Sequence, residues 1–217
     1  SERKGFTLIE LLVVIGIVAL LSVVVILTLN PAELLRQARD GVRLSEIATL
    51  NRAIDILVTE DSNVNLGVAQ TVYISIPDTV STCDNFLSDL PQLPMNWFYH
   101  CVDEVNFRNT NGSGWVPLNF TSISFGSPLS VLPVDPVNDA AAGLYYAYVS
   151  DGSYVIVSFL ESEKHLKGSA LGDGGTDPGR FEVGSDLSLW SQATALNSYW
   201  RFDEGSGTTI GDLSGNG

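Results

Sequence analysis

One carboxylate, Glu10, lies inside the long apolar run near the start of this chain. The stretch "GFTLIE" is followed at once by "LLVVIGIVALLSVVVILTL", so residues 6–29 contain no other charged side chain. A charge within an apolar helix is costly unless another group neutralises it. We therefore expect Glu10 to meet a positive partner, and the nature of that partner is a clue to function.

Two loops carry clusters of the oxygen ligands that Ca²⁺ prefers. One cluster stands in "LPVDPVND" and the other in "GDGGTDPG". Neither completes a calcium-loop pattern, and Asp, Asn and Gly are also the residues of ordinary turns. Calcium binding and plain turn formation therefore both stay open for Asp135, Asn138, Asp139, Asp173 and Asp177.

Catalytic chemistry has little support in the sequence. Only two histidines occur, His100 and His165, and they are far apart in the chain. The chain contains no nucleophile motif, paired-histidine metal site or phosphate-binding loop. We predict that the protein is not an enzyme.

Two cysteines, Cys83 and Cys101, lie in the acidic part of the chain that follows residue 60. If this part of the chain is extracytoplasmic, a disulfide between them would stabilise it by about 3 kcal/mol through loop closure. The alternative is a pair of free, buried thiols.

The net charge of −14 is unevenly distributed. Residues 1–60 carry a net charge of −1 and residues 61–217 a net charge of −13. An acidic body of this kind repels nucleic acids and anionic lipid surfaces, so we predict no direct nucleic-acid binding.

The apolar run from Phe6 to Leu29 is long enough to cross a bilayer as a helix. A cleaved secretory signal would have a shorter apolar region and a small-residue cleavage site. Arg3 and Lys4 precede the run, which favours a cytoplasmic N-terminus and an extracytoplasmic body. The run therefore indicates a single N-terminal membrane anchor in the inner or cytoplasmic membrane.

The stretch "KGFTLIELLVVIGIVALL" resembles the N-terminal signature of type IV prepilins and type II secretion pseudopilins. The resemblance implies that a prepilin peptidase cuts between Gly5 and Phe6 and that Phe6 is then N-methylated. It also implies that Glu10 neutralises the new α-ammonium of Phe6, commonly on a neighbouring subunit. The alternative is an unprocessed anchor in which Glu10 merely lies at the membrane interface.

Residues 34–58 show a helical stripe of apolar residues, which should pack on a folded body. The stripe consists of Ile47, Leu50, Ile54, Leu57 and Val58, with Arg43 and three other charged residues off it. Between the two helical segments, Pro31 either kinks one helix or stands at the first position of a new helix capped by Asn30.

Beyond Glu60 the periodicity changes to that of strands. Residues 70–77 alternate, and residues 144–162 predict two strands around "SDGS", a hairpin turn. Residues 132–177 also resemble the C-terminal sheet of major pseudopilins, where calcium is commonly bound. The predicted fold is α+β and pilin-like, with a long N-terminal helix packed on a small antiparallel sheet.

The tail, "LNSYWRFDEGSGTTIGDLSGNG", resembles the opening strands of laminin-G or concanavalin A-like domains. About 20 residues cannot close such a sandwich. We expect either the truncated start of a lectin-like domain or a disordered tail. The predicted organisation is a leader (1–5), a transmembrane and assembly helix (6–30), an amphipathic helix (31–60), an acidic β-rich body (61–190) and this tail (191–217).

Together these features predict a structural subunit of a type IV pilus or of a pseudopilus-like filament. Its expected partners are copies of itself, prepilin peptidase, a membrane assembly platform and, indirectly, the ATPase of that platform. The alternative is a minor pilin that displays a carbohydrate- or surface-binding domain at its C-terminus. The residues do not distinguish a pilus from a secretion or uptake filament.

Overall fold

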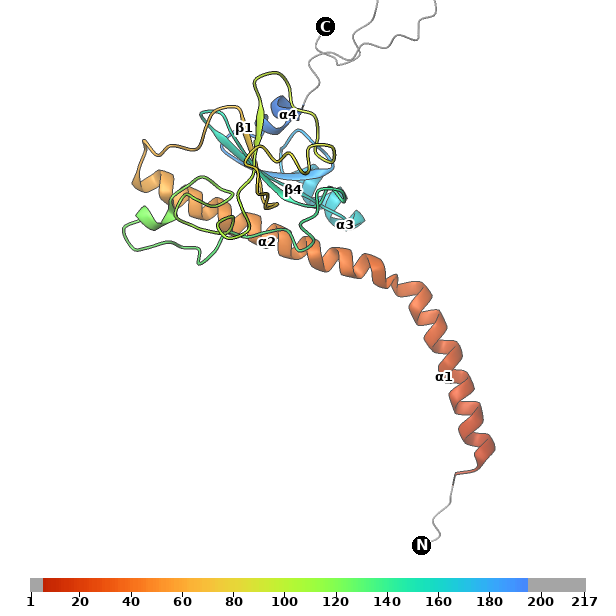
Figure 1. Cartoon of the computed structure of the whole chain (residues 1–217). Coiled ribbons are helices and arrows are strands. Elements are labelled where there is room, and N and C mark those ends of the chain that lie inside the picture. The colour runs from red at the N-terminus through yellow and green to blue at the C-terminus, as the bar shows by residue number, and fades with distance from the viewer. Residues whose placement is uncertain (1–5, 195–217) are drawn as a thin grey trace, which may run out of the picture.

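A computed structural model describes the backbone of residues 6–194 and the side chains of residues 6–23 and 30–194. Two helices come first, and a five-stranded sheet with short helices follows (Figure 1). The elements are α1 (Leu8–Leu29), α2 (Pro31–Glu60), β1 (Thr71–Ile74), β2 (Phe98–His100), the 3-10 helix η1 (Phe120–Ser122), β3 (Tyr146–Ser150), β4 (Tyr154–Phe159), α3 (Glu163–His165), the π-helical turn η2 (Leu166–Ala170), β5 (Arg180–Gly184) and α4 (Leu189–Thr194).

Asn30 separates α1 from α2. Its backbone is left-handed, with φ 41°, so the α1 ladder ends there. The same residue caps α2, since its side-chain oxygen accepts a hydrogen bond from the amide of Glu33, 3.4 Å away. Pro31 occupies the first turn of α2, where its missing N–H is not needed. Of the two predicted alternatives, the capped new helix is therefore confirmed.

Over the part of the chain whose side chains are described, no helix is both long and apolar enough to cross a membrane.

The sheet has the strand order β2-β1-β3-β4-β5. The hairpin of β3 and β4 turns at Gly152, whose φ is 74°, as the "SDGS" turn predicts. The prediction of a purely antiparallel sheet is wrong at one edge, because β1 and β2 are parallel. Parallel neighbours need a crossover connection, and residues 75–97 supply one.

Both faces of the sheet are covered, which explains why β1 and β3 are buried at every residue. One face packs on α2, where the tyrosines of β3 and β4 meet the predicted stripe of Ile47, Leu50, Ile54 and Leu57. Val58, predicted to be the last residue of this stripe, is 36% exposed. The opposite face packs on α4 through Trp190 and on the segment that holds Cys83 and Cys101.

The fold is therefore α+β, as predicted. The acidic body, predicted for residues 61–190, is continued by α4, since Trp190 and Ala193 of this helix are buried against the sheet. The leader, residues 1–5, and the lectin-like segment beyond Thr194 lie outside the described residues.

Candidate functional site

The first turn of α1 holds Glu10 in a reciprocal cap with Thr7. The amide and the hydroxyl of Thr7 donate to Glu10 Oε2 at 2.8 and 2.7 Å. In return, the amide of Glu10 donates to the hydroxyl of Thr7 at 3.3 Å. Both bonds to the carboxylate use Oε2, and the other carboxylate oxygen makes no hydrogen bond within the described residues. Glu10 can therefore keep its helix cap while it accepts a further donor.

The surface of α1 around Glu10 is apolar on every side and exposed. Phe6 and Leu8 are 82% and 83% exposed, and the other large apolar side chains up to Val23 are at least 49% exposed. In Figure 1, α1 extends away from the body beyond the start of α2. A helix that is apolar all round normally has to be buried, in a membrane or among other helices. The described surface of α1 is therefore one that a membrane or other helices would have to cover.

The other polar groups along the described part of α1 are satisfied within the helix. The hydroxyl of Ser22 donates to the carbonyl of Val18 at 2.8 Å, one turn earlier. A hydroxyl bonded in this way adds little polarity to the helix surface. Glu10 is thus the single charged side chain that α1 presents to a partner over its described residues.

A buried cluster of ionic side chains, here called the junction network, attaches α2 to the body. It consists of Asp40, Arg43, Asp135 and Glu161, together with the half-exposed Arg39. Arg43 is fully buried and donates to both oxygens of Asp135, at 2.5 and 2.9 Å. It also donates to Asp40 at 2.8 Å and to Glu161 at 2.5 Å.

The junction network is completed from the segment after β4. Asp40 accepts hydrogen bonds from the backbone amides of Glu161 and Ser162, at 3.0 and 2.7 Å, and from the Ser162 hydroxyl at 2.6 Å. Arg39 makes a two-pronged pair with Glu161, at 2.7 and 2.6 Å. Three distant segments, around residues 40, 135 and 161, are therefore fixed to one another where α2 enters the body.

The charges of the junction network shift one another's proton affinity. The hydrogen bond from Arg39 lowers the pKa of Glu161 to about 2. Burial acts in the opposite direction, and Arg43 lowers the pKa further. Although burial opposes its charged form, the bonds to Asp135 and Glu161 raise the pKa of Arg43. Both groups are therefore ionised at neutral pH, and the role of the cluster is structural attachment.

The first predicted calcium cluster is occupied by protein contacts. Asp135 pairs with Arg43, and Asn138 exchanges hydrogen bonds with Ser75, at 2.7 and 3.1 Å. Asp139 accepts from the amides of Ala141 and Ala142 in a turn. These are the turn and packing roles that the sequence left open as the alternative to calcium.

The second predicted calcium cluster lies in the loop before β5. Asp173 accepts from the amides of Gly175 and Glu182, at 2.7 and 2.8 Å, and Asp177 pairs with Arg180 at 2.6 Å. Burial and the two nearby aspartates raise the pKa of Glu182, although backbone amides at Asp177 and Thr176 oppose this rise. Among the described residues, no group of three or more His, Cys, Asp or Glu side chains is arranged to hold a metal ion. Calcium binding stays a prediction.

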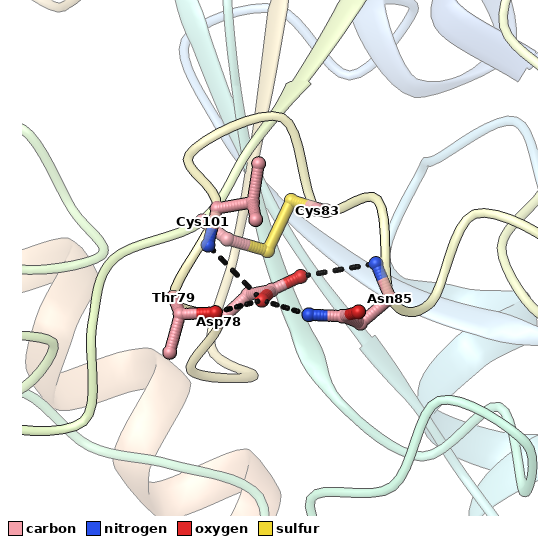
Figure 2. The surroundings of a disulfide bond; sticks show 6 residues. Asp78, Thr79, Cys83, Asn85 and Cys101 are labelled. Carbon is pink, nitrogen blue, oxygen red and sulfur yellow. Dashed lines mark hydrogen bonds between the residues drawn. A yellow bond between two sulfur atoms is a disulfide. The ribbon is translucent and has the colours of Figure 1, made fainter.

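Cys83 and Cys101 form a disulfide bond, with their Cα atoms 5.3 Å apart. Asp78 lies beside it (Figure 2). Its carboxylate accepts hydrogen bonds from the amides of Val80 and Asn85 and from the Asn85 side chain, at 3.1, 3.2 and 2.6 Å. Although burial acts in the opposite direction, these bonds lower the pKa of Asp78. The disulfide and this carboxylate together fix the start of the crossover between β1 and β2.

The two histidines lie in separate places. His100 is half-buried on β2 with its ring 5.1 Å from that of Tyr73, and burial lowers its pKa. His165 contacts the hydroxyl of Ser169, 3.1 Å from Nδ1.

Comparison with protein families identifies one match, over residues 1–26, to the prokaryotic N-terminal methylation motif. The match contains Gly5, Phe6 and Glu10, the residues singled out from the sequence. Comparison with curated proteins and with solved structures returned no match. Of the sequence-predicted sites, the motif covers the one at the start of α1 and neither of the two acidic loops.

Sequence reasoning missed the junction network. The sequence pattern predicts Arg43 to lie off the apolar stripe of α2, but it is fully buried and lies four residues before Ile47, on the same helix face. The signal that could have found it is the spacing of Asp40 and Arg43, an i, i+3 pair on one helix face.

Proposed function

Because residues 1–26 carry the N-terminal methylation motif of type IV pilins and pseudopilins, we propose that the chain is a structural subunit of such a filament. The observation that carries the proposal is the exposed, all-round apolar surface of α1, with Glu10 as its single described charge. Association of α1 helices from several copies would keep this surface away from water once the subunit has left the membrane.

Processing would prepare the first turn of α1 for that assembly. Hydrolysis of the Gly5–Phe6 peptide bond releases residues 1–5 and leaves an α-amino group on Phe6, which methylation keeps basic. In apolar surroundings this ammonium needs a counter-charge. The carboxylate of Glu10 on a neighbouring copy fits that need, since one of its oxygens accepts no hydrogen bond within the described residues.

Before assembly, we place residues 6–29 in the inner or cytoplasmic membrane as a single pass, with the body outside. The support is the length of the apolar run and the position of Arg3 and Lys4 ahead of it. A membrane assembly platform would draw the subunit out, and its ATPase would act through that platform. The adhesin alternative depends on residues 195–217, which are outside the described part of the chain.

The role of Glu10 can be tested by exchanging it for glutamine, because an amide oxygen can keep the cap to Thr7 while the charge is lost. In cells that express the assembly machinery, we expect Glu10→Gln to reduce the yield of sheared filaments at least about tenfold. The matched control is Ser22→Ala, which alters a side chain bonded within the same helix and should leave the yield unchanged.

The readout is the ratio of sheared to membrane-bound subunit, measured by quantitative immunoblotting. Equal amounts of membrane-bound subunit in both variants show that expression is not the cause. Normal filament yield from Glu10→Gln would contradict the assigned role of the Glu10 charge in assembly.

A further inference from the structure

A cavity of about 390 Å³ lies on the body beside β2, at the edge of the sheet. Of its lining residues, all except Thr82 lie between Cys83 and Cys101, so the disulfide closes the loop that builds its walls. The volume lies within the range of small-molecule sites in proteins. We call this feature the β2 cavity.

The walls of the β2 cavity are fixed by hydrogen bonds. The phenol of Tyr99 donates to the carbonyl of Pro91 at 2.7 Å, which ties the part of the wall around Pro91 to β2. The amide of Phe98 donates to the carbonyl of Gln70 at 3.0 Å, and that of Trp97 to Pro94 at 3.1 Å. The cavity is therefore preformed, so a ligand would not have to order it on binding.

The lining combines aromatic rings with uncommitted polar groups. Phe98 is 64% exposed and Trp97 partly so. Within the described residues, the side chains of Thr82, Asp84 and Gln92 make no hydrogen bond to another protein group, although all three line the cavity. Polar groups of this kind are available to a ligand.

We propose that the β2 cavity binds a neutral saccharide. Sugar rings present apolar faces that stack on aromatic side chains, and their hydroxyl groups both donate and accept hydrogen bonds. Thr82 and Gln92 can also do both, while Asp84 accepts. A simple cation could use Asp84 and the rings, but it would make no use of the donors of Thr82 and Gln92.

Charge decides which saccharides fit. The lining contains one carboxylate and no lysine or arginine, and residues 61–217 have a net charge of −13. Anionic sugars are therefore repelled by the protein, whereas the binding of neutral sugars is not weakened by charge repulsion. This binding activity goes beyond the filament proposal and does not depend on it.

The test uses the full chain, purified in a detergent without a sugar headgroup. Maltotriose, cellotriose and chitotriose are the neutral probes, and sialyllactose is the anionic probe, each titrated by saturation-transfer NMR. We expect at least one neutral trisaccharide to bind with a dissociation constant of about 1 mM or lower, and sialyllactose to bind at least about tenfold more weakly. Asp84→Asn should narrow the difference in affinity between the neutral trisaccharides and sialyllactose, because it removes the one carboxylate of the lining.

Phe98→Ala should weaken neutral binding about tenfold, because it removes an exposed ring without disturbing the core. Phe125→Ala is the matched control, since Phe125 is 71% exposed and does not line the cavity. Circular dichroism and an intact disulfide, measured by mass, verify the fold of each variant.

Three results would overturn the proposal. The first is the absence of neutral trisaccharide binding up to about 10 mM. The second is unchanged binding by a folded Phe98→Ala variant, and the third is equal binding of sialyllactose. If Phe98→Ala instead lowers filament yield while no saccharide binds, the cavity is a contact between copies.

Discussion

At the scale of single residues, Arg43 neutralises two buried carboxylates at once, those of Asp40 and Asp135. Removing one member of a buried ionic cluster leaves the others uncompensated, which typically costs about 3–5 kcal/mol. We therefore predict that Arg43→Ala lowers the free energy of unfolding by this amount. Urea titration of the full chain, followed by the fluorescence of its tryptophans, measures the change.

Arg52→Ala is the control for that prediction. Arg52 lies on the exposed face of the same helix, and surface substitutions usually change stability by less than about 0.5 kcal/mol. Similar unfolding midpoints for the two variants would show that the junction network does not hold α2 to the body.

Glu161 should make stability depend on acid pH. Its pKa falls from 4.5 to about 2 in the fold, chiefly through Arg39. A lowered carboxylate pKa stabilises the fold above the unfolded pKa, and this contribution is lost as pH falls from about 4.5 towards about 2. Allowing for screening, we expect Glu161→Gln to cost about 2 kcal/mol near neutral pH and roughly half of that or less at about pH 3.

The measurement is the difference in unfolding free energy between wild type and Glu161→Gln at both pH values. Taking a difference removes the effect of the other carboxylates, which titrate in both proteins. A difference that stays constant with pH would mean that the ionised form of Glu161 contributes nothing.

At the scale of elements, the stripe of α2 is what the sheet packs on. Leu50 is fully buried, and truncating a buried leucine typically costs about 2–5 kcal/mol. We predict a loss of this size for Leu50→Ala and a much smaller one for Val58→Ala, since Val58 is 36% exposed. Equal losses in thermal or urea unfolding would place the two side chains in equivalent surroundings, contrary to the structure.

Sequence periodicity predicted the helices and strands well where a local sequence pattern determines the structure. The stripe from Ile47 to Leu57, the hairpin at "SDGS" and the break at Pro31 all follow from local patterns. Pairings between segments that are distant in sequence could not be predicted. The parallel pairing of β1 with β2, for example, depends on a long crossover. The same is true of the junction network, whose partners are up to 122 residues apart in sequence.

At the scale of the whole molecule, the described part of the chain divides into an exposed apolar helix, α1, and a folded acidic body. The junction network fixes α2, which follows α1 at Asn30, to the body through residues 39–43. The β2 cavity lies in the disulfide-closed loop of the body. The apolar surface of α1 and the β2 cavity therefore lie on separate parts of the molecule.

The most direct test of this account is the state of the N-terminus after exposure to prepilin peptidase. The chain would be co-expressed with that enzyme, and intact mass and N-terminal sequencing would be compared with a Gly5→Leu control. The account predicts loss of Ser1–Gly5 and one added methyl group on Phe6, both absent from the control. An uncut N-terminus, under conditions where a known prepilin is cleaved, would contradict it.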